Sequence, residues 1–454
     1  MKALHQNILE RFDQIINDTA AHIHDFIDDS HAFTRKRSLD AFTVLKMTIN
    51  MQGNCLSKEI DDALDDNSPN GSDIVSVSAY VQQKAKLSPK CFEHIFHALN
   101  DKFPAKTQLN NKYFVFAFDG TDLDQLWNPK SHNKILVKNN QSYCQIHNNA
   151  MYNLLDNTYQ DCILQPKAQM DERGAALQML KRLNCSHPYI VLMDRGYESF
   201  NLIENCNRLP NCYYVIRART GGIKEISALP DKTCDTDITC RVTISNHYYT
   251  MNHKKENIHL ISHVKHHYNT SFSKNTRDQR WDFGNFCDIK FRACKIKVND
   301  PDTGKEEWEV LLTNLDRQEF PLEQMKELYH LRWGIESSFR KLKYDLGSIQ
   351  FHSKQDRFVE MEIYAHMAMF NVVSLINNQA YVPQHDCKYQ YMINFKMSWS
   401  IVHKRYPVSV SLSNENFIGI LIRISKYVVP IRPGRKDKRN LKAKSAVYYM
   451  YRVA

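Results

Sequence analysis

The sequence lacks the features that mark membrane and secreted proteins. It contains no run of about 18 uncharged apolar residues, so we expect no membrane-spanning helix. The N-terminus carries Glu10, Asp13 and Asp18 and has no apolar core segment, so we expect no signal peptide. These absences predict a cytoplasmic protein without a membrane partner.

Closely paired cysteines are also missing. The twelve cysteines are scattered, and no two of them form a Cys-x-x-Cys pair. Cys206/Cys212 and Cys234/Cys240 are the closest pairs and lack the spacing of a zinc site. This pattern favours reduced, mostly buried thiols in a cytosolic protein.

Histidines are frequent between residues 247 and 267, which invites a metal hypothesis. Their spacing fits no zinc rule, and no cysteine or carboxylate set completes a site in the sequence. We therefore predict no histidine metal site in this segment. The histidines concerned are His247, His253, His259, His263, His266 and His267.

The composition is that of an ordinary globular protein. The 454 residues are 43% hydrophobic and 24% charged, and the length allows two to four domains. The 60 Lys and Arg residues exceed the 50 Asp and Glu residues, which gives a formal net charge of +10. This modest excess fits a polyanionic partner such as nucleic acid without demonstrating one.

The first hundred residues read as helical. Between the first two expected helices lies a short basic turn, residues 33–38. A further helix is predicted over residues 76–86, with Ser76 or Ser78 as its N-cap. Its polar side chains could lie against DNA, or the segment could be a surface helix of a small bundle, which residue chemistry alone favours. These side chains are Tyr80, Gln83, Lys84 and Lys86.

Two apolar runs each end at an aspartate beside a glycine. Residues 113–118 are continuously apolar and precede Asp119, and residues 189–193 precede Asp194. Such runs predict strands buried on both faces. Two strand-end carboxylates in one sheet would lie at the same edge, where sheet-based sites form. The alternative for Asp119 is a simple turn residue, which is common in Asp-Gly.

From about residue 220 to 315 the pattern alternates and predicts β-structure. Roughly 140 residues separate Asp194 from Glu336, far more than an ordinary loop, so we expect an insertion with its own fold. Trp308 lies near its end, just before the run Leu311–Thr313. Without further information Trp308 reads as a core or sheet-edge residue.

The segment 321–344 has no internal proline and predicts one long helix that stops at Gly347. Helical geometry places four of its side chains within an arc of about 60°. A carboxylate on such a face can hold a divalent cation while the neighbouring cations and phenol hold phosphate oxygens. The alternative is a solvated face with an i,i+4 ion pair. The four are Tyr329, Arg332, Glu336 and Lys343.

The order Tyr-x2-Arg-x3-Glu-x6-Lys resembles the Tyr-Arg-Glu-Lys (YREK) signature of DDE transposases of the insertion-sequence-four family, which cut and paste DNA. Asp119-Gly120-Thr121 and residues 194–197 resemble the aspartate motifs of that family. The resemblance implies an α/β fold with an RNase H-like core. It also implies that Asp119, Asp194 and Glu336 are catalytic and bind two Mg²⁺ ions, for which Mn²⁺ may substitute.

The same resemblance implies how DNA is handled. Tyr329, Arg332 and Lys343 would hold phosphates, and Trp308 would take the space of a flipped base. The partners would be double-stranded terminal inverted repeats and target DNA, bound by a homodimer at the bacterial nucleoid. Two rival functions remain open, an RNase H-like nuclease without strand transfer and a non-catalytic DNA-binding regulator derived from a transposase.

The sequence patterns and the resemblance together imply five parts of the chain. They are a helical N-terminal DNA-binding domain (1–104), the first part of the RNase H-like core (105–219), a β-rich insertion (220–315), the second part of the core with the signature helix (316–384), and a helical, basic C-terminal segment (385–454). The basic tail could contact DNA or merely solvate the chain.

Overall fold

The computed structural model describes most of the chain. The described residues are 7–35, 38–64, 75–138, 141–219, 221–261, 280–299, 306–345, 350–382, 389–406, 408 and 413–432. The basic tail from residue 433 onward, three of the histidines considered above (His263, His266 and His267) and Gly347 lie outside them.

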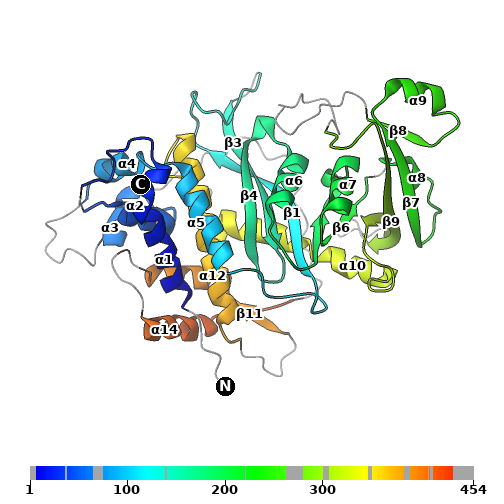
Figure 1. The fold of residues 1–454 in the computed structure, drawn as a ribbon. Helices are drawn as coiled ribbons and strands as arrows, with labels where there is room; N and C mark the ends of the chain where they lie inside the picture. Colours follow the sequence, from blue (N-terminus) through cyan, green and yellow to red (C-terminus); the bar gives the residue numbers. More distant parts are fainter. Residues whose placement is uncertain are drawn as a thin grey trace.

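One large mixed sheet forms the centre of the molecule (Figure 1). Its middle strands β1, β5 and β6 are parallel to one another, whereas β3 and β4 are antiparallel neighbours on the β1 side. In sheet order the strands are β2 (Lys134–Ile135), β3 (Tyr143–Asn153), β1 (Phe114–Gln125), β5 (Tyr189–Met193), β6 (Cys212–Arg217), β10 (Glu306–Thr313), β9 (Phe286–Asn299), β7 (Cys234–Thr243) and β8 (Ile258–Leu260), with β4 (Thr158–Pro166) paired to β3.

Both faces of the central strands are buried, as their continuous apolar runs predict. In β1, Phe116 and Phe118 belong to the core on one face, beneath α6 and α7. Val115 belongs to the core on the other face, beneath α10. The covering helices are α6 (Glu172–Arg182), α7 (Phe200–Arg208), α10 (Leu322–His330) and α11 (Trp333–Arg340), with the 3₁₀ turns η3 (Lys167–Gln169) and η4 (Arg195–Tyr197).

The segment 220–315 is rich in strands in its described part, as the sequence predicts, but it shares its sheet with the rest of the chain. Its strands β10, β9, β7 and β8 continue the central sheet beyond β6. The physical reason is that β6 would otherwise expose unpaired backbone N–H and C=O groups, which β10 pairs through Leu311–Thr313. The described part of the segment also contains the short helices α8 (Lys224–Ser227) and α9 (Asn246–Asn252).

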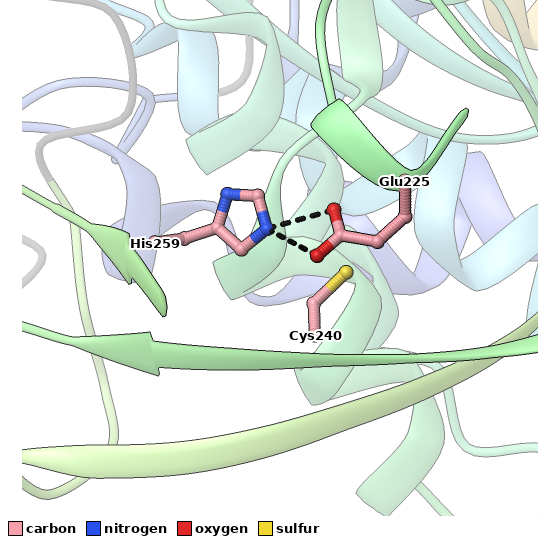
Figure 2. Close-up of side chains that lie close together, drawn as sticks. All are labelled: Glu225, Cys240 and His259. Atoms are coloured by element: carbon pink, nitrogen blue, oxygen red, sulfur yellow. Dashed lines mark hydrogen bonds and ion pairs between the residues drawn. The ribbon is translucent and has the colours of Figure 1, made fainter. Parts of the chain in front are cut away.

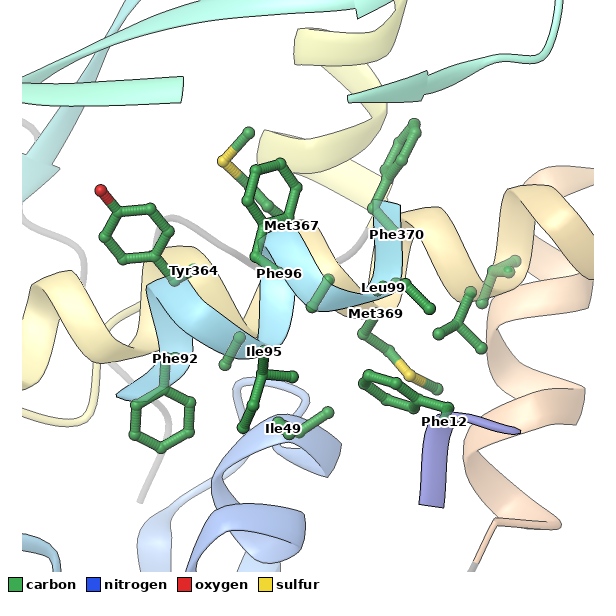
Figure 3. Close-up of a cluster of buried hydrophobic side chains, with 14 of the residues drawn as sticks. Phe12, Ile49, Phe92, Ile95, Phe96, Leu99, Tyr364, Met367, Met369 and Phe370 are labelled. Carbon is green, nitrogen blue, oxygen red and sulfur yellow. The ribbon is translucent and has the colours of Figure 1, made fainter. Parts of the chain in front are cut away.

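A helical body packs around the long helix α12 (Asp356–Gln379), beside the sheet (Figure 1). Figure 3 shows buried side chains of α5 and α12 in one cluster, with Phe96 of α5 beside Met367 of α12. The body also contains α1 (Ile8–Ala21), η1 (Ile23–Phe26), α2 (Ala41–Asn50), α3 (Leu56–Leu64), α4 (Val77–Lys84), α5 (Pro89–Lys102), α13 (Phe395–Lys404), α14 (Asn414–Ser425) and the hairpin β11 (Tyr391–Ile393) with β12 (Val428–Pro430). The N-terminal helices therefore share one core with α12 and the C-terminal helices.

Helix α12 is long and apolar enough to cross a membrane by length and composition alone. However, 89% of its most apolar 18-residue window is buried inside the protein. This burial is typical of the central helix of a folded core.

The polar face predicted for residues 76–86 is only partly a surface. Ser76 caps α4 as expected, through a hydrogen bond from the Ala79 N–H. Tyr80 is fully buried, with its hydroxyl 2.6 Å from the Thr48 hydroxyl. Lys84 is also buried and lies 2.9 Å from the Glu362 carboxylate of α12. Neither side chain can lie against DNA in this structure, because each is buried in the core against a residue that is remote in the sequence.

The expected single helix over residues 321–344 is instead three segments, α10, α11 and the π-helical turn η5 (Lys341–Asp345). Between α10 and α11 the backbone N–H groups of Arg332, Gly334 and Ile335 bond three residues back, which tightens the chain locally. A Cβ at Gly334 would stand 2.7 Å from a methyl group of Leu154, so glycine permits α11 to approach the sheet closely.

Candidate active site

Strand register places Asp119 and Asp194 side by side. Phe118 of β1 pairs with Met193 at the end of β5, and the two aspartates are the next residues of these parallel strands. Contrary to expectation, β1 does not end at Asp119. It continues to Gln125 because β3 pairs with it on the other side. Asp119 is therefore held inside a strand at the point where its neighbour β5 ends.

Both aspartates belong to the face of the sheet that α10 and α11 cover. Side chains alternate along a strand, and Val115 and Leu192 lie in the core beneath α10. Asp119 and Asp194 follow them at even spacing and share their face. One oxygen of each carboxylate accepts a backbone N–H, from Gly120 at 2.9 Å and from Gly196 at 2.7 Å. These bonds fix the orientation of both side chains.

Arg332 joins the third acid to this pair. Its Nη2 donates to Glu336 Oε1 over 2.7 Å, and its Nη1 lies 3.7 Å from Asp119 Oδ2. The guanidinium is almost wholly buried at the junction between α10 and α11. The i,i+4 ion pair considered from the sequence therefore exists, but its buried arginine faces Asp119, so it is not a solvated surface pair.

Burial raises the pKa of Asp119 to about 7. The Arg332 guanidinium and the Gly120 N–H oppose this rise in the Asp119 pKa, whereas the charges of Asp194 and Glu336 add to it. The Asp119 carboxylate thus interacts electrostatically with those of Asp194 and Glu336. Their oxygen-only donor set fits a hard divalent cation such as Mg²⁺ or Mn²⁺, which would relieve the mutual repulsion.

Tyr329 lies beside Arg332, whose guanidinium carbon is 5.8 Å from the phenol ring. Burial raises the pKa of Tyr329 to about 12, so the phenol keeps its proton at neutral pH. Its hydroxyl and the Arg332 Nε are buried, and neither has a hydrogen-bond partner within the part of the chain that the structure describes. Two buried polar groups beside the acids are therefore available to an incoming polar ligand.

Lys343 and Trp308 lie in parts of the structure different from those of Tyr329 and Arg332. Lys343 is half-buried in the π-helical turn η5, after α11. Trp308 lies in β10 opposite Lys297, and the Lys295 and Lys297 ammonium groups stand 4.9 Å and 5.5 Å from its ring. The next residue, Glu309, points to the opposite face. The structure therefore brings Tyr329 and Arg332 to the acids but places Trp308 on the other side of the sheet.

Sequence reasoning missed Glu309 and Arg217. Glu309 is buried on the face of Tyr329 and Arg332, and Arg217 Nε of β6 lies 3.1 Å from its carboxylate. Burial raises the pKa of Glu309, while Arg217 and Arg332 oppose that rise. A carboxylate between Trp308 and the apolar run 310–312 was the available signal, since a buried strand rarely carries one without a partner.

A protein family and a solved structure show similarity to this chain. The family described as "Transposase DDE domain" matches residues 111–372, which include Asp119, Asp194 and Glu336. Among solved structures the chain is similar to the piggyBac transposase in a cryo-EM synaptic complex with hairpin DNA, with a TM-score of 0.45 and 12% sequence identity over 93% of this chain and 86% of that one. No curated protein sequence matches the chain. Because the family match covers more than half of the chain, this protein belongs to the DDE transposases.

Proposed function

We propose that this protein is a cut-and-paste DNA transposase of the insertion-sequence-four family. The observation that carries the proposal is that Asp119 lies beside Asp194 in the sheet and shares Arg332 with Glu336. The sheet supports an RNase H-like core, since β4, β3 and β1 run antiparallel beside the parallel strands β5 and β6. The spacing of Tyr329, Arg332, Glu336 and Lys343 supports the narrower family.

In this proposal the three acids hold two divalent metal ions, either Mg²⁺ or Mn²⁺. Bound there, such ions would stabilise the attacking and leaving oxygens of an in-line displacement at phosphorus. Asp119 and Asp194 provide fixed carboxylates because their strands and backbone N–H bonds hold them. Glu336 is on a separate helix and is positioned by Arg332.

The neighbouring polar groups hold the DNA backbone. The buried Tyr329 hydroxyl and Arg332 Nε are donors without a described partner, and a phosphate oxygen would satisfy both. Lys343 adds positive charge on the following turn. Trp308 is proposed to stack on DNA distorted at the cleavage site, which requires the DNA to reach the face of the sheet that carries Lys295 and Lys297.

The reaction would proceed in four displacements. Water first cuts one strand at the transposon end, and the freed 3′-hydroxyl attacks the opposite strand to form a hairpin. A second water opens the hairpin, and the 3′-ends are then joined to target DNA. In this proposal a synaptic homodimer joins the two ends. The reaction would take place in the cytoplasm, on the bacterial nucleoid.

The test is a reconstituted reaction with the full chain, Mg²⁺, DNA carrying the flanking inverted repeats of the element, and a supercoiled target. The proposal predicts nicked, hairpin and open-ended DNA followed by end-joined products. Cleavage without joined products would identify a nuclease. Specific binding of the ends without any cleavage would identify a DNA-binding regulator.

A further inference from the structure

Three potential metal ligands meet far from the acids described above. Glu225 of α8, Cys240 of β7 and His259 of β8 point toward one another in Figure 2. His259 Nε2 lies 3.0 Å and 2.8 Å from the two carboxylate oxygens of Glu225. One ligand atom from each of the three residues lies within 4.8 Å of the others. Among the residues that the structure describes, no other set of three such side chains brings its ligand atoms this close.

The donor set matches zinc. Thiolate sulfur, imidazole nitrogen and carboxylate oxygen are the ligands that Zn²⁺ takes in proteins, whereas Mg²⁺ prefers oxygen alone. Zinc bonds of about 2.0–2.3 Å place tetrahedral ligand atoms about 3.5 Å apart. To reach that arrangement, the 2.8 Å and 3.0 Å contacts between His259 and Glu225 must open slightly, and any wider separation, at most 4.8 Å, must close. Three protein ligands leave a fourth position, which water can fill.

The surroundings hold the three side chains in place. Cys240 is fully buried, and the Glu225 and His259 side chains are 15% and 11% exposed. The Asn257 amide donates to Glu225 Oε1 over 2.7 Å, and the Phe200 ring packs against the His259 ring with centroids 4.9 Å apart. A hydrogen bond to a ligating carboxylate is the kind of support that metal sites use to orient their ligands.

We propose that Glu225, Cys240 and His259 bind one Zn²⁺ ion, which joins α8 to the outer edge of the sheet. The edge strand β8 has only three residues and pairs with β7 alone, so it has few contacts of its own. The ion would tie it to α8 across more than thirty residues of chain. The strands β6, β10 and β9 separate this site from β1 and β5. The ion is thus independent of the transposase chemistry.

The test uses the full chain, stripped of metal and kept in excess Mg²⁺ so that the oxygen-only acids are saturated. One equivalent of Co²⁺ should produce the near-ultraviolet charge-transfer band of a cobalt–thiolate bond, and Zn²⁺ should displace it. Cys240→Ser should abolish the band and lower Zn²⁺ affinity at least tenfold. Cys294→Ser is the matched control, because Cys294 is equally buried in the adjacent strand β9. This variant should leave the charge-transfer band and the Zn²⁺ affinity unchanged.

Two further variants keep the proposal falsifiable if Cys240→Ser does not fold. Glu225→Gln preserves shape and should weaken Zn²⁺ binding at least tenfold, whereas His247→Ala at a nearby exposed histidine should not. Absence of the thiolate band in the wild-type chain would overturn the proposal and leave a Glu225–His259 hydrogen bond only. Equal Zn²⁺ affinity in the wild-type chain and Glu225→Gln would overturn it as well.

Discussion

The Arg332 guanidinium donates a 2.7 Å hydrogen bond to the Glu336 carboxylate from an almost fully buried position. It therefore fixes the one acid that comes from a helix and not from the sheet. Arg332→Lys keeps the charge but loses the fork that reaches both Glu336 and Asp119.

We expect Arg332→Lys to slow metal-dependent strand cleavage at least tenfold, with a smaller loss of DNA affinity. Single-turnover cleavage and equilibrium binding measure the two effects separately. Arg340→Lys, at an exposed position of the same helix, is the control and should cleave normally. An unchanged cleavage rate in Arg332→Lys would show that Arg332 does not position Glu336.

The triad is tested by removing each acid in turn. Asp119→Ala, Asp194→Ala and Glu336→Ala should each abolish Mg²⁺-dependent cleavage while leaving binding to the transposon end nearly intact, because phosphate contacts elsewhere remain. Asp124→Ala is the control, since Asp124 is an exposed aspartate of the same strand β1. Any of the three that cleaves at the wild-type rate is not a metal ligand.

The proposal that Trp308 stacks on distorted DNA predicts a selective defect. Trp308→Ala would lose base stacking of roughly 1–3 kcal/mol. Nicking needs little distortion and should survive, so nicked DNA should accumulate at the expense of hairpin and open end in a gel time course. Uniform slowing of all steps would instead mark Trp308 as a packing residue between Lys295 and Lys297, where the structure places it.

The buried ion pair between Lys84 and Glu362 links α4 to α12. Lys84→Met leaves the Glu362 charge buried without this partner and should lower the free energy of unfolding by roughly 3–5 kcal/mol, measured with urea. Lys58→Met, which breaks an exposed ion pair with Asp62, should change it little. A small effect of Lys84→Met would show that His352, which also contacts Glu362, suffices to hold that carboxylate.

The same pair makes stability depend on pH in a defined direction. The charges of Lys84 and His352 hold the Glu362 pKa far below its ordinary value, despite its burial. An unfolded glutamate titrates near pH 4.3, roughly. The contribution of Glu362 is therefore fully present above that pH and is lost as the pH falls toward the folded pKa. The urea midpoint of Glu362→Gln should accordingly vary less between pH 3 and pH 5 than that of the wild-type chain.

DNA binding by the N-terminal helices must be tested in the full chain, because α1, α2 and α5 share their core with α12. Arg35 and Lys86 line a pocket of about 290 Å³ beside Phe33 and Thr34, at the basic turn. Replacing both with Gln should weaken binding to any DNA and lower the salt slope by roughly two. Lys102→Gln, at the far end of α5, is the control. An unchanged salt slope would remove this turn from the DNA contacts.

The sequence by itself determined the local features of the site. Continuous apolar runs before Asp119 and Asp194 predicted two buried strands, since only a strand covered on both faces tolerates such a run. Helical periodicity placed Arg332 and Glu336 on one face, with an ion pair between them as one of two interpretations, because residues four apart are neighbours. Ser76 or Ser78 was predicted as a helix cap for an equally local reason, and the structure selects Ser76. Each of these features depends on neighbours within a few residues.

Only the tertiary structure decided the features that depend on distant partners. β1 extends beyond Asp119 because β3 supplies hydrogen bonds, and the insertion joins the sheet because β6 offers an open edge. Lys84 is buried because Glu362 lies opposite it, 278 residues away in the chain. Glu225, Cys240 and His259 have no zinc spacing in the sequence, yet strand pairing and helix packing bring them together. Local periodicity does not predict such pairings, since they form only when segments that are distant in the sequence pack together.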